Sequence, residues 1–335
     1  MIWLKFVLCL AIILFAGTRL ARYGDAIAEK TGLGRIWIGL VLIAAITSMP
    51  ELVTAVSSAA LVGSSDLALG TLLGTCAFNL SIIALLDLLH QHTPVLSQVS
   101  SRHITSASLG ILLAAIVLGG IFIGDKLPAL TLGWVGIPSI IILVIYLVGI
   151  RRIYNNERNS QIMITQVSYP KYKDLSSVKV YVGFALAAIA IIAAGIWLSF
   201  IGDEIATTTG WGMTFVGSLF LAITTSMPEL AVAVAAVRLG ALDMAVADIL
   251  GANMLDLAYI ALVDLAYVQG PLLGSVSTGH LFTAAVVLVM SAIVIIGLRF
   301  HQKRKTFVFI SWYAPALIGL YIFAAYALFT SGLGL

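Results

Sequence analysis

The hexapeptide TSMPEL occurs twice in this 335-residue chain, at residues 47–52 and again at residues 225–230. In each copy the threonine and the glutamate are four residues apart, so on a helix both side chains lie on one face. The proline between them has no N–H group and leaves a backbone carbonyl about one turn earlier without its helical partner. Hydroxyl, carboxylate and carbonyl oxygens are the ligands that hard cations such as Ca²⁺ take. The repeated hexapeptide therefore predicts a cation site.

A second polar stripe follows each hexapeptide. Its members are four residues apart and are Thr71, Thr75 and Asn79 in the first copy, and Asp248, Ala252 and Asp256 in the second. If the two copies converge, the carboxylates of Glu51, Glu229 and Asp256 meet the amide of Asn79. We expect Asp248 either to join this site or to lie at its watery mouth.

The composition places these acids in a membrane. Hydrophobic residues make up 61% of the chain and charged residues only 10%, with a mean hydropathy of +1.10. A soluble globular protein carries about 25% charged residues. Runs of about 20 apolar residues, the length that crosses a bilayer, centre on residues 2–20, 36–62, 67–89, 104–123, 127–149, 179–201, 212–237, 243–267, 281–298 and 307–330. We therefore predict an all-α polytopic membrane protein with ten transmembrane helices.

An acid at the centre of a membrane helix costs about 2.5–3.5 kcal/mol on insertion scales. Glu51, Glu229 and Asp256 would therefore weaken insertion considerably unless bound cations offset the cost. This insertion cost favours a cation site over a purely structural role for the three acids.

Basic residues predict the orientation of the chain. When ten spans alternate across the bilayer, all of the 18 Lys and Arg residues except Lys5 and Lys126 fall on one side. That side is expected to be cytoplasmic. Both termini then lie on the extracytoplasmic side of the cell (inner) membrane.

The hexapeptides belong to a longer internal repeat, with equivalent residues 178 and then 177 positions apart. Five spans per copy is an odd number, so the second copy enters the membrane from the opposite side, as an inverted-topology repeat. We expect residues 1–150 to form the first five-helix repeat, with its α-repeat at about 36–89. Residues 151–178 are expected to be a cytoplasmic linker, and residues 179–335 the second five-helix repeat, with its α-repeat at about 212–267.

These motifs resemble a known family. AAITSMPEL with GTCAFN, and AITTSMPEL with GANMLD, are similar to the two α-repeats of the cation/calcium exchanger superfamily, in its prokaryotic sodium/calcium exchanger branch. The resemblance covers residues 24–89 and 202–267. It implies a secondary antiporter that exchanges Na⁺ for Ca²⁺ by alternating access, with the first and sixth helices sliding over a fixed core of spans 2, 3, 7 and 8.

The resemblance also implies residue roles. The expected Ca²⁺ ligands are Thr47, Glu51, Thr225 and Glu229. The positions expected to bind Na⁺ or another coupling ion are Ala44, Ser48, Thr75, Asn79, Ala222, Ser226 and Asp256, those of Ala44 and Ala222 through their carbonyls. The expected partners are the two ions and the lipid bilayer, with no cofactor, no nucleic acid, no enzymatic activity and a functional monomer.

Several positions depart from the family pattern. Ile46 and Thr224 stand where family members usually have glycine, Cys76 replaces an amide, and Ala252 removes a hydroxyl. These departures leave open a second hypothesis, a proton-coupled exchanger of Ca²⁺ or another divalent cation, because buried carboxylates can carry protons.

Other polar residues are given structural roles. The aspartates beside glycines at span ends are expected to cap helices, and those at far span ends to lie at the membrane interface. The first group is Asp25, Asp66, Asp203 and Asp243, and the second is Asp87 and Asp264. His90, His92 and His103 are expected in a cytoplasmic loop, in a solvated or weakly metal-binding role.

Overall fold

The computed structural model describes residues 1–31, 43–90, 93–124, 130–161, 176–300, 302, 304–307 and 309–332. In the first half the elements are α1 (Ile2–Thr31), α3 (Ile43–Thr47), α4 (Met49–Ser57), the π-helix η2 (Ser58–Val62), α5 (Ser65–Leu89), α6 (Val95–Gln98), α7 (His103–Phe122), β1 (Thr131–Leu132), β2 (Val135–Gly136) and α8 (Ile137–Gln161). In the second half they are α9 (Ser177–Thr209), α10 (Met213–Val216), the π-helix η4 (Gly217–Leu221), α11 (Ala222–Thr225), α12 (Met227–Arg238), α13 (Leu242–Ala266), the 3₁₀ helix η5 (Leu272–Gly274), α14 (Gly279–Arg299) and α15 (Tyr313–Gly332).

The fold is a helical bundle, and the only strands among the described residues form a two-stranded hairpin, β1–β2, before α8. Seven described helices are long and apolar enough to cross a membrane: α1, α5, α7, α9, α13, α14 and α15. An eighth is obtained if Met213–Thr225 and Met227–Arg238, which meet at a 45° bend, form one span. These findings confirm an all-α membrane protein.

Two expected spans are described only in part. The span expected at 36–62 lies outside the described residues up to position 42 and continues as α3, α4 and η2. The span expected at 127–149 begins outside them, and the helix observed there, α8, starts at Ile137 and ends at Gln161. The first part of the expected linker at 151–178 is therefore a continuation of α8.

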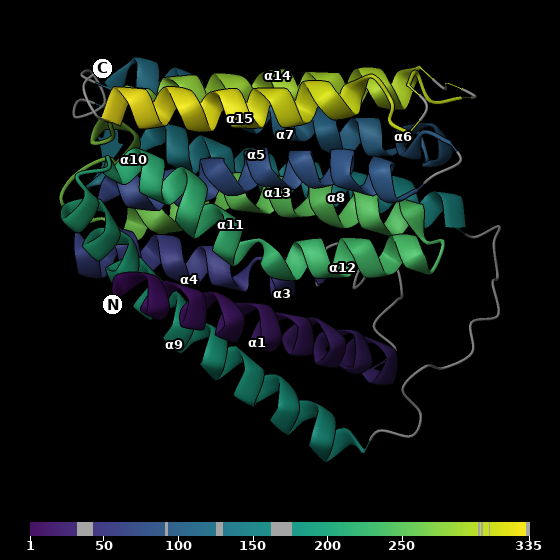
Figure 1. Ribbon diagram of the computed structural model, residues 1–335, viewed down its shortest axis with the longest axis horizontal. Helices are drawn as coiled ribbons and strands as arrows, with labels where there is room; N and C mark the ends of the chain where they lie inside the picture. Colours follow the sequence, from purple (N-terminus) through teal and green to yellow (C-terminus); the bar gives the residue numbers. More distant parts are fainter. Residues whose placement is uncertain are drawn as a thin grey trace.

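Most of the long helices lie side by side along one direction, whereas α9 runs obliquely to them, and α1 begins at the same end of the bundle where α15 ends (Figure 1). The helices α1 and α9 form one flank, and α14 and α15 lie on the opposite flank (Figure 1). Between them, α5 and α13 are the most enclosed, because 72% and 89% of their apolar windows are buried, against 22–50% for the other five spans. The centre of the molecule is therefore formed by the two helices that carry the second polar stripes.

Glycine allows the two halves to approach closely at this centre. A Cβ atom on Gly74 of α5 would lie 2.3 Å from the carbonyl oxygen of Ser218 and 2.5 Å from its Cα, both backbone atoms of η4. Such contacts are closer than side chains permit. The π-helix η4 is thus seated directly against the backbone of α5.

Both hexapeptides interrupt a helix at their serine. Ser48 separates α3 from α4 with φ −82° and ψ 12°, and Ser226 separates α11 from α12 with φ −81° and ψ 5°. Pro50 and Pro228 lie in the first turn of the helix that follows, where a missing N–H is tolerated. The proline therefore begins a new helix segment in each half.

The predicted helix caps are wrong. Ser64 caps α5 by accepting a hydrogen bond from the Leu67 amide at 3.1 Å. Asp66 and Asp243 bind other segments instead, and Asp25 and Asp203 lie inside α1 and α9. The glycines that precede Asp25 and Asp203 do not mark helix ends, because α1 and α9 continue for several residues past them.

One other expectation is also wrong, because His103 is buried at the start of α7, not solvated. Asp87 and Asp264 are fully buried within the protein, near the ends of α5 and α13, and their position at the membrane interface stays a prediction. His92 lies outside the described residues. Contacts with the other half of the chain, described below, explain the burial of both aspartates and of His103.

Candidate ion-binding site

The two broken helices meet at the centre of the bundle. Ser48 Oγ donates a hydrogen bond to Glu229 Oε1 at 3.2 Å, which joins the first break to the second. The hydroxyl of Ser226 donates to that of Thr75 at 3.3 Å, and the hydroxyls of Thr75 and Thr225 are 3.5 Å apart. The structure therefore brings together predicted residues that lie about half the chain apart.

Four carboxylates surround this meeting point, and all are buried: Glu51, Glu229, Asp256 and Asp248. Glu229 interacts electrostatically with Glu51 and with Asp248, and Glu51 interacts with Asp256. Like charges so close in a low-dielectric interior repel strongly unless cations or protons lie between them.

Most of the carboxylate oxygens have no protein partner. Both oxygens of Glu51, Asp248 and Asp256, and Oε2 of Glu229, make no hydrogen bond of normal geometry with the described residues. Both amide atoms of Asn79 are also buried without a partner. Buried polar groups are normally hydrogen-bonded or bound to an ion. The unpaired oxygens are therefore free to act as ligands.

The threonines of the hexapeptides are oriented by backbone contacts. Thr47 Oγ1 donates to the carbonyl of Ala44 at 3.2 Å, and Thr225 Oγ1 donates to that of Ala222 at 3.2 Å. Because each hydroxyl gives its proton to a carbonyl, its lone pairs can face a cation.

The same two carbonyls also accept the amide N–H groups of Ser48 and Ser226, at 2.9 Å and 3.1 Å. The carbonyls of Ala44 and Ala222 each accept two hydrogen bonds in this structure. To bind an ion, each would have to release or share one of these donors.

Among the residues that the structure describes, no three His, Cys, Asp or Glu side chains are grouped as a metal site. The donors around the two breaks are instead two glutamates with threonine and carbonyl oxygens. This mixture of charged and neutral oxygens suits Ca²⁺ or Na⁺ more than a softer metal.

Equivalent residues of the two repeats face each other beside the site. Asn253 Nδ2 donates to the carbonyl of Cys76 at 3.1 Å, and Cys76 Sγ lies 3.7 Å from the carbonyl of Asn253. These residues are 177 positions apart, the spacing of the repeat. Cys76 therefore contributes to packing between α5 and α13.

Two tyrosines near the site were not predicted. The phenol of Tyr259 interacts electrostatically with Asp256, Glu51 and Glu229, and that of Tyr146 interacts with Asp256. Tyr259 follows Asp256 by three residues, so helical spacing could have indicated it. Tyr146 is on α8, and no sequence signal connects it to the hexapeptides.

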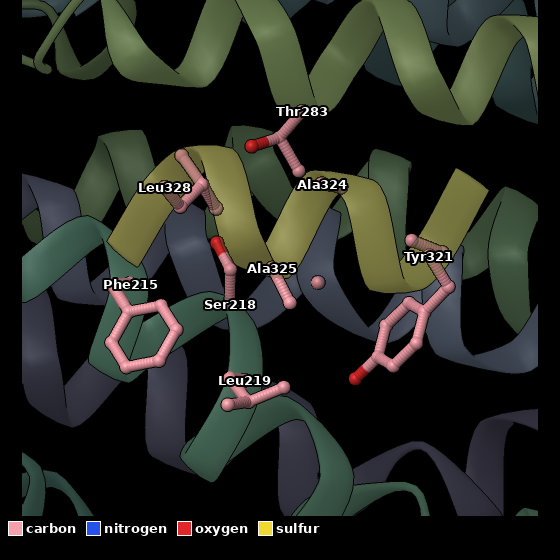
Figure 2. A pocket seen from close by; sticks show the side chains of 10 residues that line it. Phe215, Ser218, Leu219, Thr283, Tyr321, Ala324, Ala325 and Leu328 are labelled. Atoms are coloured by element: carbon pink, nitrogen blue, oxygen red, sulfur yellow. The ribbon is translucent and has the colours of Figure 1, made fainter. Parts of the chain in front are cut away.

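A small cavity lies beside α5, where Gly74 and Ala77 line it. Its volume is about 10 Å³, which is room for about one water molecule. Figure 2 shows it enclosed mainly by apolar side chains, with the hydroxyls of Ser218, Thr283 and Tyr321 at its edges. None of the site carboxylates lines this cavity, so it is separate from the candidate site.

Comparisons with known proteins identify the family of the chain. A family model described as sodium/calcium exchanger protein matches residues 1–151 and 179–333. The inner membrane protein YrbG of Escherichia coli (strain K12) is 26% identical over 255 residues, which is 75% of each chain.

Solved structures share the fold. The sodium-calcium exchanger NCX_Mj superposes with a TM-score of 0.63 and 18% identity, covering 98% of this chain and 99% of that one. The H⁺/Ca²⁺ exchanger CAX superposes with a TM-score of 0.72 and 13% identity, covering 99% of this chain and 87% of that one. With its apolar helices, the protein is a multi-pass membrane transporter of the cation/calcium exchanger superfamily. The chain belongs to the sodium/calcium exchanger protein family.

Proposed function

We propose that the protein is a secondary antiporter that exchanges Na⁺ for Ca²⁺ across the inner membrane by alternating access. The observation that carries this proposal is the meeting of Glu51 and Glu229, two buried glutamates from separate broken helices that interact with each other. One divalent cation between them would neutralise both charges. Two or more monovalent ions could replace it, which is the basis of exchange.

The ligands follow from the geometry and the family pattern. Thr47, Glu51, Thr225 and Glu229 bind Ca²⁺ with carboxylate and threonine oxygens. The coupling ion uses the surrounding oxygens of Ala44, Ser48, Thr75, Asn79, Ala222, Ser226 and Asp256. The antiporter works as a monomer in this proposal, since both halves of the site come from one chain.

The topology that we propose has ten transmembrane helices in two inverted repeats, with both termini extracytoplasmic. Three observations support it. The chain breaks a helix at the same serine in both halves, α1 begins where α15 ends (Figure 1), and the family match omits residues 152–178 between the two proposed halves. The first repeat then spans 1–150 and the second 179–335.

Proton coupling is the alternative that a specific feature favours. Asp248 adds a fourth buried carboxylate beside Glu229, and Ala252 lacks a hydroxyl that a sodium site would use. Four carboxylates carry more charge than one Ca²⁺ neutralises, so protons could carry the balance. The structural similarity to the H⁺/Ca²⁺ exchanger CAX is in line with this alternative.

Flux in proteoliposomes tests the proposal. Radioactive Ca²⁺ uptake is measured with Na⁺, K⁺ and H⁺ gradients imposed separately, and with Glu51→Gln protein as the inactive control. We expect an outward-directed Na⁺ gradient to drive uptake. Uptake driven by a pH gradient in sodium-free medium would replace Na⁺ by H⁺, and uptake that needs no counter-gradient would contradict antiport.

A further inference from the structure

Four aspartates outside the ion site connect the two halves of the molecule in a symmetric pattern. Asp66 and Asp243 are equivalent in the repeat, and so are Asp87 and Asp264, each pair 177 positions apart. Asp66 and Asp87 lie in the first and last turns of α5, and Asp243 and Asp264 occupy the same places in α13.

At the start of each helix, one aspartate oxygen accepts a backbone amide of the opposite half and also contacts a histidine of that half. Asp66 Oδ1 accepts the Ser277 amide at 2.6 Å and lies 3.2 Å from His280 Nε2. Asp243 Oδ1 accepts the Ser100 amide at 2.7 Å and lies 2.9 Å from His103 Nε2. Ser100 and Ser277, like His103 and His280, are also 177 positions apart. The same contact is thus made twice, once in each direction.

At the end of each helix, both aspartate oxygens are used. Asp87 Oδ2 accepts the Ser311 amide at 2.8 Å, and its Oδ1 accepts the Val95 amide at 3.1 Å and the Ser311 hydroxyl at 2.9 Å. Asp264 Oδ2 accepts the Gly136 amide at 2.9 Å, and its Oδ1 accepts the Leu272 amide at 2.7 Å. Ser311 and Gly136 belong to the half opposite to their aspartate. Both carboxylates are fully buried, and each of their oxygens accepts at least one hydrogen bond, Asp87 Oδ1 also from the Tyr313 hydroxyl.

The flanking helices α1 and α9 are connected differently. Among the described residues, the side-chain hydrogen bonds that α1 and α9 make with another helix all run between these two helices. Lys5 Nζ donates to the Glu204 carboxylate, and Cys9 Sγ donates to the Ala194 carbonyl. Toward the centre, α1 presents Gly17, where a Cβ atom would come within 2.3 Å of the Pro228 ring. This contact is apolar, so movement of α1 along α12 would break no hydrogen bond there.

We propose that Asp66, Asp87, Asp243 and Asp264 are positioning residues that fix both ends of α5 and α13 to the opposite repeat. These helices carry Thr75, Asn79, Asp248 and Asp256, so fixing their ends holds the ion-site oxygens in register while α1 and α9 move. The inference rests on the proposed transport function, although the contacts themselves do not.

Conservative substitutions separate the two kinds of contact. Asparagine keeps one oxygen acceptor, which is all that Asp66 and Asp243 use, whereas Asp87 and Asp264 use both oxygens. We expect Asp66→Asn and Asp243→Asn to transport Ca²⁺ with a half-saturating concentration within about two-fold of the wild type.

The disruptive variants should behave differently. Asp66→Ala, Asp243→Ala and Asp264→Asn should raise the half-saturating Ca²⁺ concentration by about three-fold or more, because misplaced ligands bind poorly. Arg102→Ala, which changes the exposed neighbour of His103, is the matched control.

The result that would overturn the proposal is an unchanged half-saturating concentration in all alanine variants, with only the yield of folded protein reduced. Equal behaviour of Asp264→Asn and Asp243→Asn would also overturn it.

A second measurement is independent of transport. In thermal unfolding of detergent-solubilised protein, Asp243→Ala and His103→Leu should lower Tm by less together than the sum of their separate effects, and Asp66→Ala with His280→Leu should do the same. Additive losses would disprove the contacts even if the protein exchanges Ca²⁺. If the losses are non-additive but the protein carries no Ca²⁺ under any gradient, the contacts are supported and the proposed antiport is contradicted.

Discussion

At the scale of single residues, the candidate site depends on buried carboxylates that interact electrostatically and whose oxygens mostly make no hydrogen bond of normal geometry with the described residues. Glu229 is the exception in part, because its Oε1 accepts a hydrogen bond from Ser48 while its Oε2 has no partner among the described residues. Ser48 therefore orients one carboxylate of the proposed Ca²⁺ pair from the other half of the chain.

Removing this donor should weaken Ca²⁺ binding without abolishing it. In Ser48→Ala the Glu229 side chain would have to be ordered by the ion itself, at a cost of about 0.5–1.5 kcal/mol. We expect the Kd for Ca²⁺, measured by calorimetry, to rise about two- to thirteen-fold. Ser57→Ala, at the end of the helix α4 that follows Ser48, should bind as the wild type does. An equal loss in both variants would contradict the role of Ser48.

At the scale of elements, sequence reasoning could locate the breaks and not the contacts made around them. Pro50 and Pro228 predicted interrupted helices because proline cannot donate to the preceding turn, and the structure breaks both helices two residues earlier. The π-helices η2 and η4 carry no such signal. The cross-repeat partners of Asp66 and Asp87 could not be predicted either, since they lie more than 200 positions away in the chain.

The contact between α5 and η4 gives a prediction at this scale. Gly74→Ala would place a methyl group against the backbone of Ser218, and overpacking of this kind costs about 1–3 kcal/mol. We expect its Tm to fall by several degrees in a thermal unfolding assay. In Gly110→Ala the new methyl group would meet no atom within 4 Å. This variant should unfold at or above the wild-type temperature, and equal Tm values for both variants would disprove the close packing.

At the scale of the whole molecule, the proposed function requires the two halves to enter the membrane from opposite sides. The repeat and the distribution of basic residues predicted this topology from sequence. Tyr146 shows the limit of that reasoning, because only the assembled bundle brings α8 beside Asp256. The meeting of Glu51 with Glu229 could be predicted, since the same six residues appear in both halves.

Reporter fusions test the orientation of the termini. Alkaline phosphatase, which is active only outside the cytoplasm, should be active when fused to either end of the chain, because ten spans return the C-terminus to the starting side. A fluorescent protein that matures only in the cytoplasm should stay dark at both ends. Phosphatase activity at one terminus and fluorescence at the other would mean an odd number of spans.

Calcium binding to the purified protein tests the shared site most directly. Equilibrium binding of radioactive Ca²⁺ should give one site per chain in the wild type and none in Glu51→Gln or in Glu229→Gln, with both variants monodisperse and folded. If either variant kept normal binding, or if the wild type bound two Ca²⁺ ions and each variant lost only one of them, the two glutamates would not hold a common ion.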